Sequence, residues 1–100
     1  MANEWEWRVG GWADERNLIK GSTPAHQLGK LIEEVGELAA AIANKNGDEI
    51  SDAIGDCTVV LCIIAEQCGL TLSQCQEAAW EQIKDRKGRM VDGVFVKEVQ

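Results

Sequence analysis

The chain of 100 residues is short of the side chains that several kinds of protein site require. It has one histidine, His26, and four cysteines that lie five, six and seven residues apart. This spacing does not match a zinc site, and no Ser, Cys or His stands in a pattern typical of a catalytic nucleophile. We expect a surface or capping role for His26. Cys57 and Cys62 lie in an apolar run, which indicates small buried side chains in a reducing compartment.

Basic residues and long apolar stretches are also scarce. The 10 Lys and Arg residues face 17 Asp and Glu residues, and the net charge of −7 argues against binding to a nucleic-acid polymer. The longest uncharged apolar run, residues 57–65, is too short to span a bilayer. The first eleven residues, MANEWEWRVGG, lack the features of a signal peptide. These absences predict a cytoplasmic protein without a membrane partner.

Helix signals divide the chain into four segments. A short helix is expected over residues 12–20, after a flexible turn at Gly10-Gly11. Thr23 followed by Pro24 predicts the start of a second helix that continues over residues 25–43. Asn46-Gly47 ends a short polar turn, which makes the second and third helices antiparallel neighbours.

The third helix is expected from Asp48, as its cap, to about Gln67, with Gly69 as its stop. Its second half is apolar on all sides, which indicates burial in a bundle or against another subunit. A capping box from Thr71 to Gln74 predicts a fourth helix to about residue 87.

The predicted architecture is therefore an all-α bundle of four helices, the first of them short, in a single domain over residues 1–100. The bundle takes up residues 12–88. An extended tail follows over residues 89–100, with a turn at Asp92-Gly93.

Acidic residues are concentrated on the second and third helices. The first group is Glu33, Glu34 and Glu37, and the second is Asp48, Glu49, Asp52 and Asp56. Antiparallel helices would bring the two groups together across a cleft. Carboxylate oxygens on rigid helices suit a hard divalent cation, above all Mg²⁺.

The positions of these residues around each helix support the same interpretation. At about 100° per residue, Gln27, Lys30, Glu34 and Glu37 fall within a stripe about 80° wide that borders the apolar face. Glu49, Asp52 and Asp56 fall within about 60° on the third helix. The alternative is that these acids coat solvent-exposed faces. Like charges at helical spacing repel one another, so acids gathered in this way would need a counter-ion. This need favours the metal-site interpretation.

A basic group stands at the end of the fourth helix. Lys84, Arg86, Lys87 and Arg89 are four of the ten basic residues. They are suited to bind the phosphates of a polyanion whose other oxygens lie on Mg²⁺. The alternative is a favourable placement of cations at a helix carboxyl end. Lys84 and Lys87 share a helix face with Trp80, and they are the stronger candidates.

The acidic pattern resembles the MazG-like family of all-α nucleoside triphosphate pyrophosphohydrolases, whose pattern is EExxE followed by ExxD. Residues 33–37, EEVGE, match the first half, and Asp56 matches the final acid. Ala53 stands where the family has Glu, and Asp52 is the candidate replacement. A competing register takes residues 49–52 as ExxD. We prefer the first register because the apolar run follows Asp56 directly. The resemblance extends over residues 12–98. Over this range the sequence is similar to the short single-domain members found in bacteria and their phages.

The resemblance implies hydrolysis of a nucleoside or deoxynucleoside triphosphate to the monophosphate and pyrophosphate, in nucleotide-pool housekeeping. It implies Mg²⁺, with Mn²⁺ as a possible substitute, held by Glu34, Glu37 and Asp56 with Asp52. Glu33 is the candidate general base. The candidate substrate-binding residues are Gln27, Lys30, Lys84 and Lys87.

The resemblance also implies a homodimer or homotetramer in which the bundle is completed between subunits. Trp12 and Trp80 either stack on a base or fill the core. Two other functions stay open: a related pyrophosphohydrolase of the phosphoribosyl-ATP type, and a non-enzymatic helical interaction module.

Overall fold

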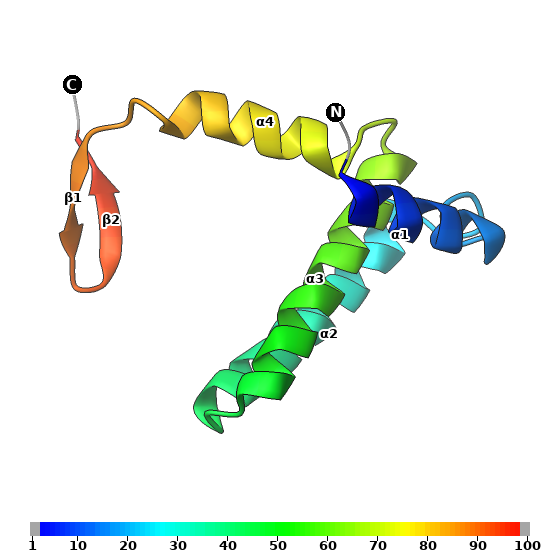
Figure 1. The fold of residues 1–100 in the computed structure, drawn as a ribbon, viewed down its shortest axis with the longest axis horizontal. Coiled ribbons are helices and arrows are strands. Elements are labelled where there is room, and N and C mark those ends of the chain that lie inside the picture. The colour runs from blue at the N-terminus through cyan, green and yellow to red at the C-terminus, as the bar shows by residue number, and fades with distance from the viewer. Residues whose placement is uncertain (1–2, 99–100) are drawn as a thin grey trace.

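The computed structural model describes residues 3–98, and residues 1, 2, 99 and 100 of the predicted domain lie outside this range. The expected all-α class is confirmed, with four helices and one small strand pair (Figure 1). The elements in chain order are α1 (Glu4–Glu15), α2 (Pro24–Ala43), α3 (Gly47–Gln67), α4 (Leu72–Ile83), β1 (Gly88–Val91) and β2 (Val94–Lys97).

The antiparallel pair of α2 and α3 forms the long limb of the molecule (Figure 1). Thr23 caps α2 as expected, because its side chain accepts a hydrogen bond from the backbone N–H of His26. The predicted cap of α3 was wrong. Asn46 is the cap, since its side chain accepts from the N–H of Glu49, and Asp48 already lies in the first helical turn. Gly69 follows the end of α3 with a φ of +76°.

The predicted first helix was wrong in its position. The helix begins at Glu4, because Asn3 accepts a hydrogen bond from the backbone N–H of Glu6, and it ends at Glu15, before residues 16–20. Gly10 and Gly11 therefore lie inside a helix and form no turn. Gly10 is buried against α3, where a Cβ atom would come within 2.8 Å of the Glu66 carboxylate. A glycine at this point lets α1 pack closely across α3.

The C-terminal arm, which we define as α4 with the β1–β2 hairpin, projects away from α2 and α3 (Figure 1). The capping box of Thr71 and Gln74 is confirmed. The helix ends at Ile83 and not near residue 87, because Lys87 already pairs with Glu98 at the open end of the hairpin. Asp92 and Gly93 form the expected turn, with φ of +49° and +82°.

The core of the chain is small. α3 is its central helix and packs against α2, α1 and α4, as its apolar sequence predicts. The buried apolar side chains are Ala13, Ala41, Ala53, Val60, Cys62, Ile63 and Ala65. Trp12 and Trp80 remain 46% and 57% exposed, so neither fills the core of one copy of the chain.

The four cysteines are free, as expected. Cys62 is buried, while Cys57 is half-buried. Burial, together with the negative charges of Glu66 and Glu6, raises the pKa of the Cys62 thiol to about 11. Separately, no single helix among residues 3–98 is long and apolar enough to cross a membrane. Among these residues, α3 and α4 are long and apolar enough when they are counted as one segment, but the chain bends by 98° between them.

Candidate metal centre

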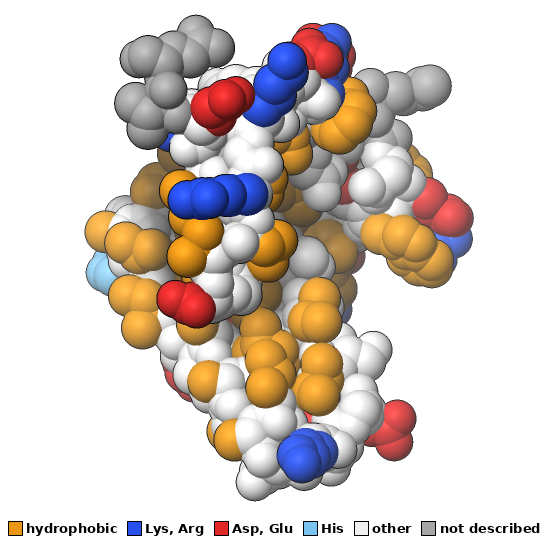
Figure 2. Space-filling view, turned by 90° about the vertical axis from the view of Figure 1, so that its left-hand side faces the viewer, with side chains coloured by type: hydrophobic (Ala, Val, Ile, Leu, Met, Phe, Trp, Pro, Cys, Tyr) orange, Lys and Arg blue, Asp and Glu red, His pale blue; other side chains and the backbone are white. Residues whose placement is uncertain are grey.

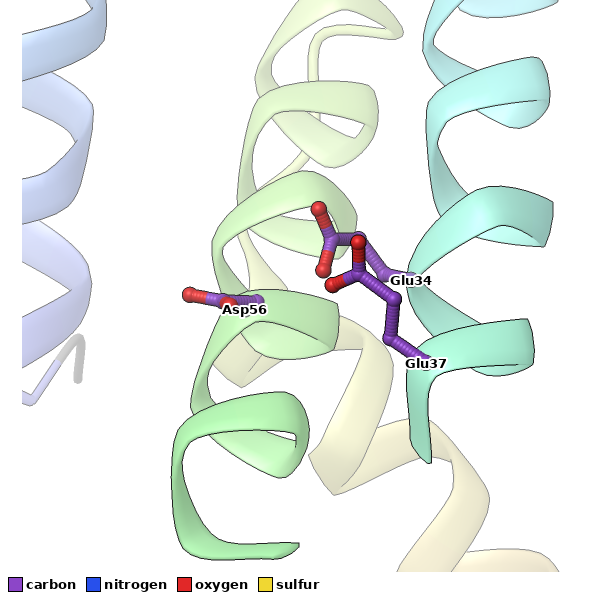
Figure 3. Close-up of side chains that lie close together, drawn as sticks. All are labelled: Glu34, Glu37 and Asp56. Atoms are coloured by element: carbon purple, nitrogen blue, oxygen red, sulfur yellow. The ribbon is translucent and has the colours of Figure 1, made fainter. Parts of the chain in front are cut away.

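Three carboxylates meet between α2 and α3. One ligand oxygen each from Glu34, Glu37 and Asp56 lies within 4.8 Å of the other two. Figure 3 shows Glu34 and Glu37 reaching from α2 toward α3 beside Asp56. The spacing of three residues places both glutamates on one face of α2, and the short turn before α3 brings Asp56 opposite them. We call these three residues the acidic cluster.

Glu34 is the buried member of the cluster, with 6% of its surface exposed. Its Oε1 lies 3.2 Å from Nζ of Lys30, while its Oε2 is buried without a hydrogen-bond partner. A buried carboxylate oxygen without a partner is costly unless a cation or a donor satisfies it. Glu37 and Asp56 are exposed, so the cluster has one buried anchor and two accessible ligands.

The charges in and beside the cluster shift the pKa values of their neighbours. A hydrogen bond with Glu34, and then the negative charges of Glu34 and Glu33, raise the pKa of Glu37 above its usual value. The hydrogen bond with Glu34 and the charge of Glu33 likewise raise the pKa of Lys30. The three oxygen ligands and the unsatisfied Oε2 fit a hard divalent cation, which would relieve this repulsion.

Asp52 and its alternative, Glu49, line the same groove without belonging to the cluster. The groove has a volume of about 300 Å³ and is lined by Glu37, Ala40, Glu49, Asp52, Ala53 and Asp56. Ala53 is buried at the groove wall, and both acids lie on the exposed part of α3 toward its start. The structure therefore brings both candidates to the site.

Lys30, Glu33 and Gln27 form local contacts. Lys30 lies 3.6 Å from Glu33 as well as beside Glu34, so it acts as a counter-ion within α2. The Glu33 side chain is exposed to solvent on the side of Lys30 away from Glu34. Gln27 donates a hydrogen bond from Nε2 to Oγ of Ser22, 3.0 Å away.

Lys84 and Lys87 are not brought to the cluster within one copy of the chain. Lys84 follows the end of α4 and lies 2.8 Å from Glu81. Lys87 lines a separate groove with Arg86 and Lys97. Figure 1 shows that this end of α4 lies away from the α2–α3 pair.

Comparison with known proteins agrees with this geometry. The model of the MazG nucleotide pyrophosphohydrolase domain matches residues 22–91, which include the whole acidic cluster. The chain belongs to the MazG family.

One curated relative is similar to about half of the chain. It is an uncharacterized 18.2 kDa protein in the rep-hol intergenic region of Haemophilus phage HP1, strain HP1c1. The two sequences are 52% identical over 56 residues, which cover 56% of this chain and 34% of the relative. The chain thus corresponds to about a third of that protein's length. No solved structure matches the chain.

A second acidic group lies outside the residues that the sequence pattern selects. Glu6, Asp14 and Glu66 surround a groove of about 760 Å³ beneath α1, lined also by Trp7 and Trp12. We call it the α1 groove. Glu6 is buried and accepts hydrogen bonds from the backbone N–H and the hydroxyl of Ser73 on α4. Only the Asn3 cap followed by Glu6 three residues later signals this helix start in the sequence.

Proposed function

We propose that this MazG protein hydrolyses a nucleoside or deoxynucleoside triphosphate between the α and β phosphates, and releases the monophosphate and pyrophosphate. The observation that supports this proposal is the acidic cluster, with three carboxylates inside 4.8 Å and an unsatisfied buried oxygen on Glu34. Such a site is suited to charge neutralisation at a phosphoryl group and needs no covalent nucleophile.

Glu34, Glu37 and Asp56 are proposed to hold Mg²⁺, with Mn²⁺ as a substitute. Asp52 is the proposed fourth ligand, and Glu49 is its alternative in the same groove. The bound ion would supply Lewis-acid stabilisation of the charge that develops on the α-phosphate.

The remaining residues have proposed roles around this centre. Lys30 holds Glu34 in place through its 3.2 Å contact and lies beside the entry of the substrate phosphates. Glu33, on the outer side of Lys30, accepts the proton of the attacking water. Gln27, one turn earlier on α2, contacts the nucleoside end of the substrate.

The proposed setting is the cytoplasm, where the four free cysteines would stay reduced. The proposed role is to remove non-standard nucleotides or to adjust the deoxynucleotide pool.

The test is an assay of the purified protein with each of the eight common NTPs and dNTPs in the presence of Mg²⁺, with products separated by chromatography. We expect monophosphate and pyrophosphate, lost on addition of EDTA and in Glu37→Ala. The matched control is Glu15→Ala, an exposed carboxylate on α1 outside the cluster. Release of diphosphate and phosphate would refute cleavage between the α and β phosphates. No turnover of any of the eight, with an unchanged melting temperature on adding Mg²⁺ and nucleotide, would favour the interaction module.

A further inference from the structure

The C-terminal arm carries a concentration of positive charge. Residues 84–97 contain five basic and two acidic residues, a net charge of +3, in a chain whose net charge is −7. Figure 2, from the side to which the arm projects, shows Lys and Arg side chains across the upper part of this face, where the arm lies. Lys84 and Lys87, the candidate phosphate-binding residues, stand where α4 ends. Their position therefore follows the direction of α4.

Packing holds α4 only weakly. None of its 12 residues is buried. At its start, Leu72 and Gln76 line a cavity of about 170 Å³ together with Trp5 and Val9 of α1, so a gap separates the two helices there. The direction of α4 therefore depends on polar contacts at its first turn.

The hydrogen bonds that join α4 to another helix within residues 3–98 all end on Glu6. The carboxylate of Glu6, on α1, accepts a hydrogen bond of 2.9 Å from the backbone N–H of Ser73 and a second one from the Ser73 hydroxyl. This N–H is one of the four at the start of a helix that have no partner inside it, and the helix dipole favours a carboxylate at that end. Glu6 therefore caps α4 from outside, in addition to the local capping box of Thr71 and Gln74.

Glu6 is itself fixed to the central helix. Its backbone carbonyl accepts a hydrogen bond from the thiol of the buried Cys62 on α3, over 3.6 Å. Asn3 caps the turn of α1 in which Glu6 lies, because its side chain accepts a hydrogen bond from the Glu6 N–H. Although burial acts to raise the pKa of Glu6, hydrogen bonds from Ser73, Leu72 and Asn3 lower it, so the carboxylate is charged at neutral pH. Glu6 thus links α3 to α4 through α1.

A small change at this contact becomes a large one at the lysines. Lys84 lies 11 residues beyond Ser73, or about 16 Å at 1.5 Å per residue. A tilt of about 10° at Ser73 moves Lys84 by about 3 Å over this length, which is about the length of a hydrogen bond. An ammonium group displaced by this distance no longer contacts the phosphate that it binds.

We propose that Glu6 is a positioning residue for substrate binding, because its cap on α4 sets the direction of the arm and with it the place of Lys84 and Lys87 at the substrate phosphates. Glu6 acts through Ser73 and the rigid helix, and it does not touch the substrate. The lysines lie away from the cluster of their own copy, so this role belongs to the oligomer that the family resemblance implies. The inference rests on the proposed function, because it concerns the triphosphate of the same reaction.

A double-mutant cycle in KM tests this role, with the best substrate of the eight nucleotides. Glu6→Ala should raise KM about tenfold and leave kcat within about twofold, because it weakens binding and not the chemical step. The double variant Lys84→Ala with Lys87→Ala should raise KM at least as much. Adding Glu6→Ala to that variant should raise KM by less than about twofold further, since the lysines that Glu6 positions are already absent.

Two further variants complete the cycle. Glu4→Ala, at an exposed position on the same helix, is the matched control and should change KM by less than about twofold. Glu6→Gln keeps an oxygen that accepts from the Ser73 N–H, so it should raise KM less than Glu6→Ala does. An unchanged KM in Glu6→Ala would overturn the proposal. The same tenfold rise with and without the two lysines would also overturn it, because Glu6 would then act by another route.

The direction of α4 can be measured without turnover. Residual dipolar couplings of the backbone N–H groups report the angle between α3 and α4, which is 98° in this structure. We expect Glu6→Ala to reduce the couplings of α4 relative to those of α3, and Glu4→Ala to leave both unchanged. Couplings of α4 that stay at the wild-type values in Glu6→Ala would overturn the inference, whatever the activity. A wild-type protein that turns over no nucleotide would instead refute the proposed function.

Discussion

Two groups of carboxylates lie at different levels along α3, where Asp56 of the first and Glu66 of the second are 10 residues, or about 15 Å, apart. Each group has a buried carboxylate oxygen without a hydrogen-bond partner, on Glu34 and on Glu66, but the groups differ in how closely their carboxylates gather and in what Glu6 binds. The acidic cluster gathers Glu34, Glu37 and Asp56 from two helices, and its buried oxygen has no donor. In the α1 groove, both carboxylate oxygens of Glu6 accept hydrogen bonds from Ser73, which lies in the first turn of α4. The comparison shows that acidic composition alone does not identify a metal site. The cluster holds three carboxylate oxygens within 4.8 Å of one another and can accept a cation, while the charge of Glu6 anchors α4 through Ser73.

The largest expected difference between the two groups is in activity. Glu34→Gln should lower kcat/KM by more than about 100-fold, since it removes a proposed metal ligand that is also the buried member of the cluster. Glu66→Gln, the same substitution in the α1 groove, should leave kcat/KM within about twofold. Steady-state kinetics at saturating Mg²⁺ checks both variants. Equal losses in the two would show that the α1 groove takes part in the reaction.

Mg²⁺ should distinguish the groups by stability as well. An ion present at 100 times its dissociation constant stabilises the folded state by about 2.7 kcal/mol. We expect a stabilisation of this order in wild-type protein and in Glu66→Gln, and none in Glu34→Gln. Thermal unfolding with and without Mg²⁺ measures it. A stabilisation that persists in Glu34→Gln would place the ion outside the cluster.

The anchoring role of Glu6 predicts the next largest effect. Glu6→Ala leaves the N–H of Ser73 without its buried acceptor, which should cost about 1–3 kcal/mol in the free energy of unfolding. Glu4→Ala, on the same helix, removes only an exposed pair with Arg8 and should cost less than about 1 kcal/mol. Urea unfolding compares the two variants. A loss no larger than that of Glu4→Ala would contradict the anchoring role.

The sequence predicts α2, α3 and the acidic cluster well for physical reasons that are local. Thr23-Pro24 starts a helix, the short turn before Gly47 imposes antiparallel packing, and the apolar run directly after Asp56 identifies that residue as the final acid of the pattern. The position of α1 was missed because Gly10 suits a close helix crossing that only the packed structure reveals. The direction of α4 depends on Glu6 and Ser73, which are 67 residues apart, and no local pattern encodes such a contact.

The smallest predicted effect concerns pH, and it uses the two glutamates of the α1 groove. Burial, then the negative charges of Glu6 and Asp14, raise the pKa of Glu66 above 4.5. Burial also acts to raise the pKa of Glu6, but hydrogen bonds from Ser73, Leu72 and Asn3 outweigh it and lower that pKa. The two carboxyl groups therefore titrate in different ranges of pH.

Their contributions to stability must change with pH in opposite directions. The folded protein holds the Glu66 proton more tightly than the unfolded chain, so stability falls as the pH rises from about 4.5 through the raised pKa. Glu6 contributes stability above about pH 4.5, and this is lost as the pH falls through its lowered pKa. Glu66→Gln should thus stabilise the protein by about 0.5 kcal/mol at neutral pH and lose that advantage toward pH 4.5. Urea unfolding across this range measures the difference from wild type, and an advantage that grows on acidification would contradict the burial of an unpartnered Glu66 carboxylate.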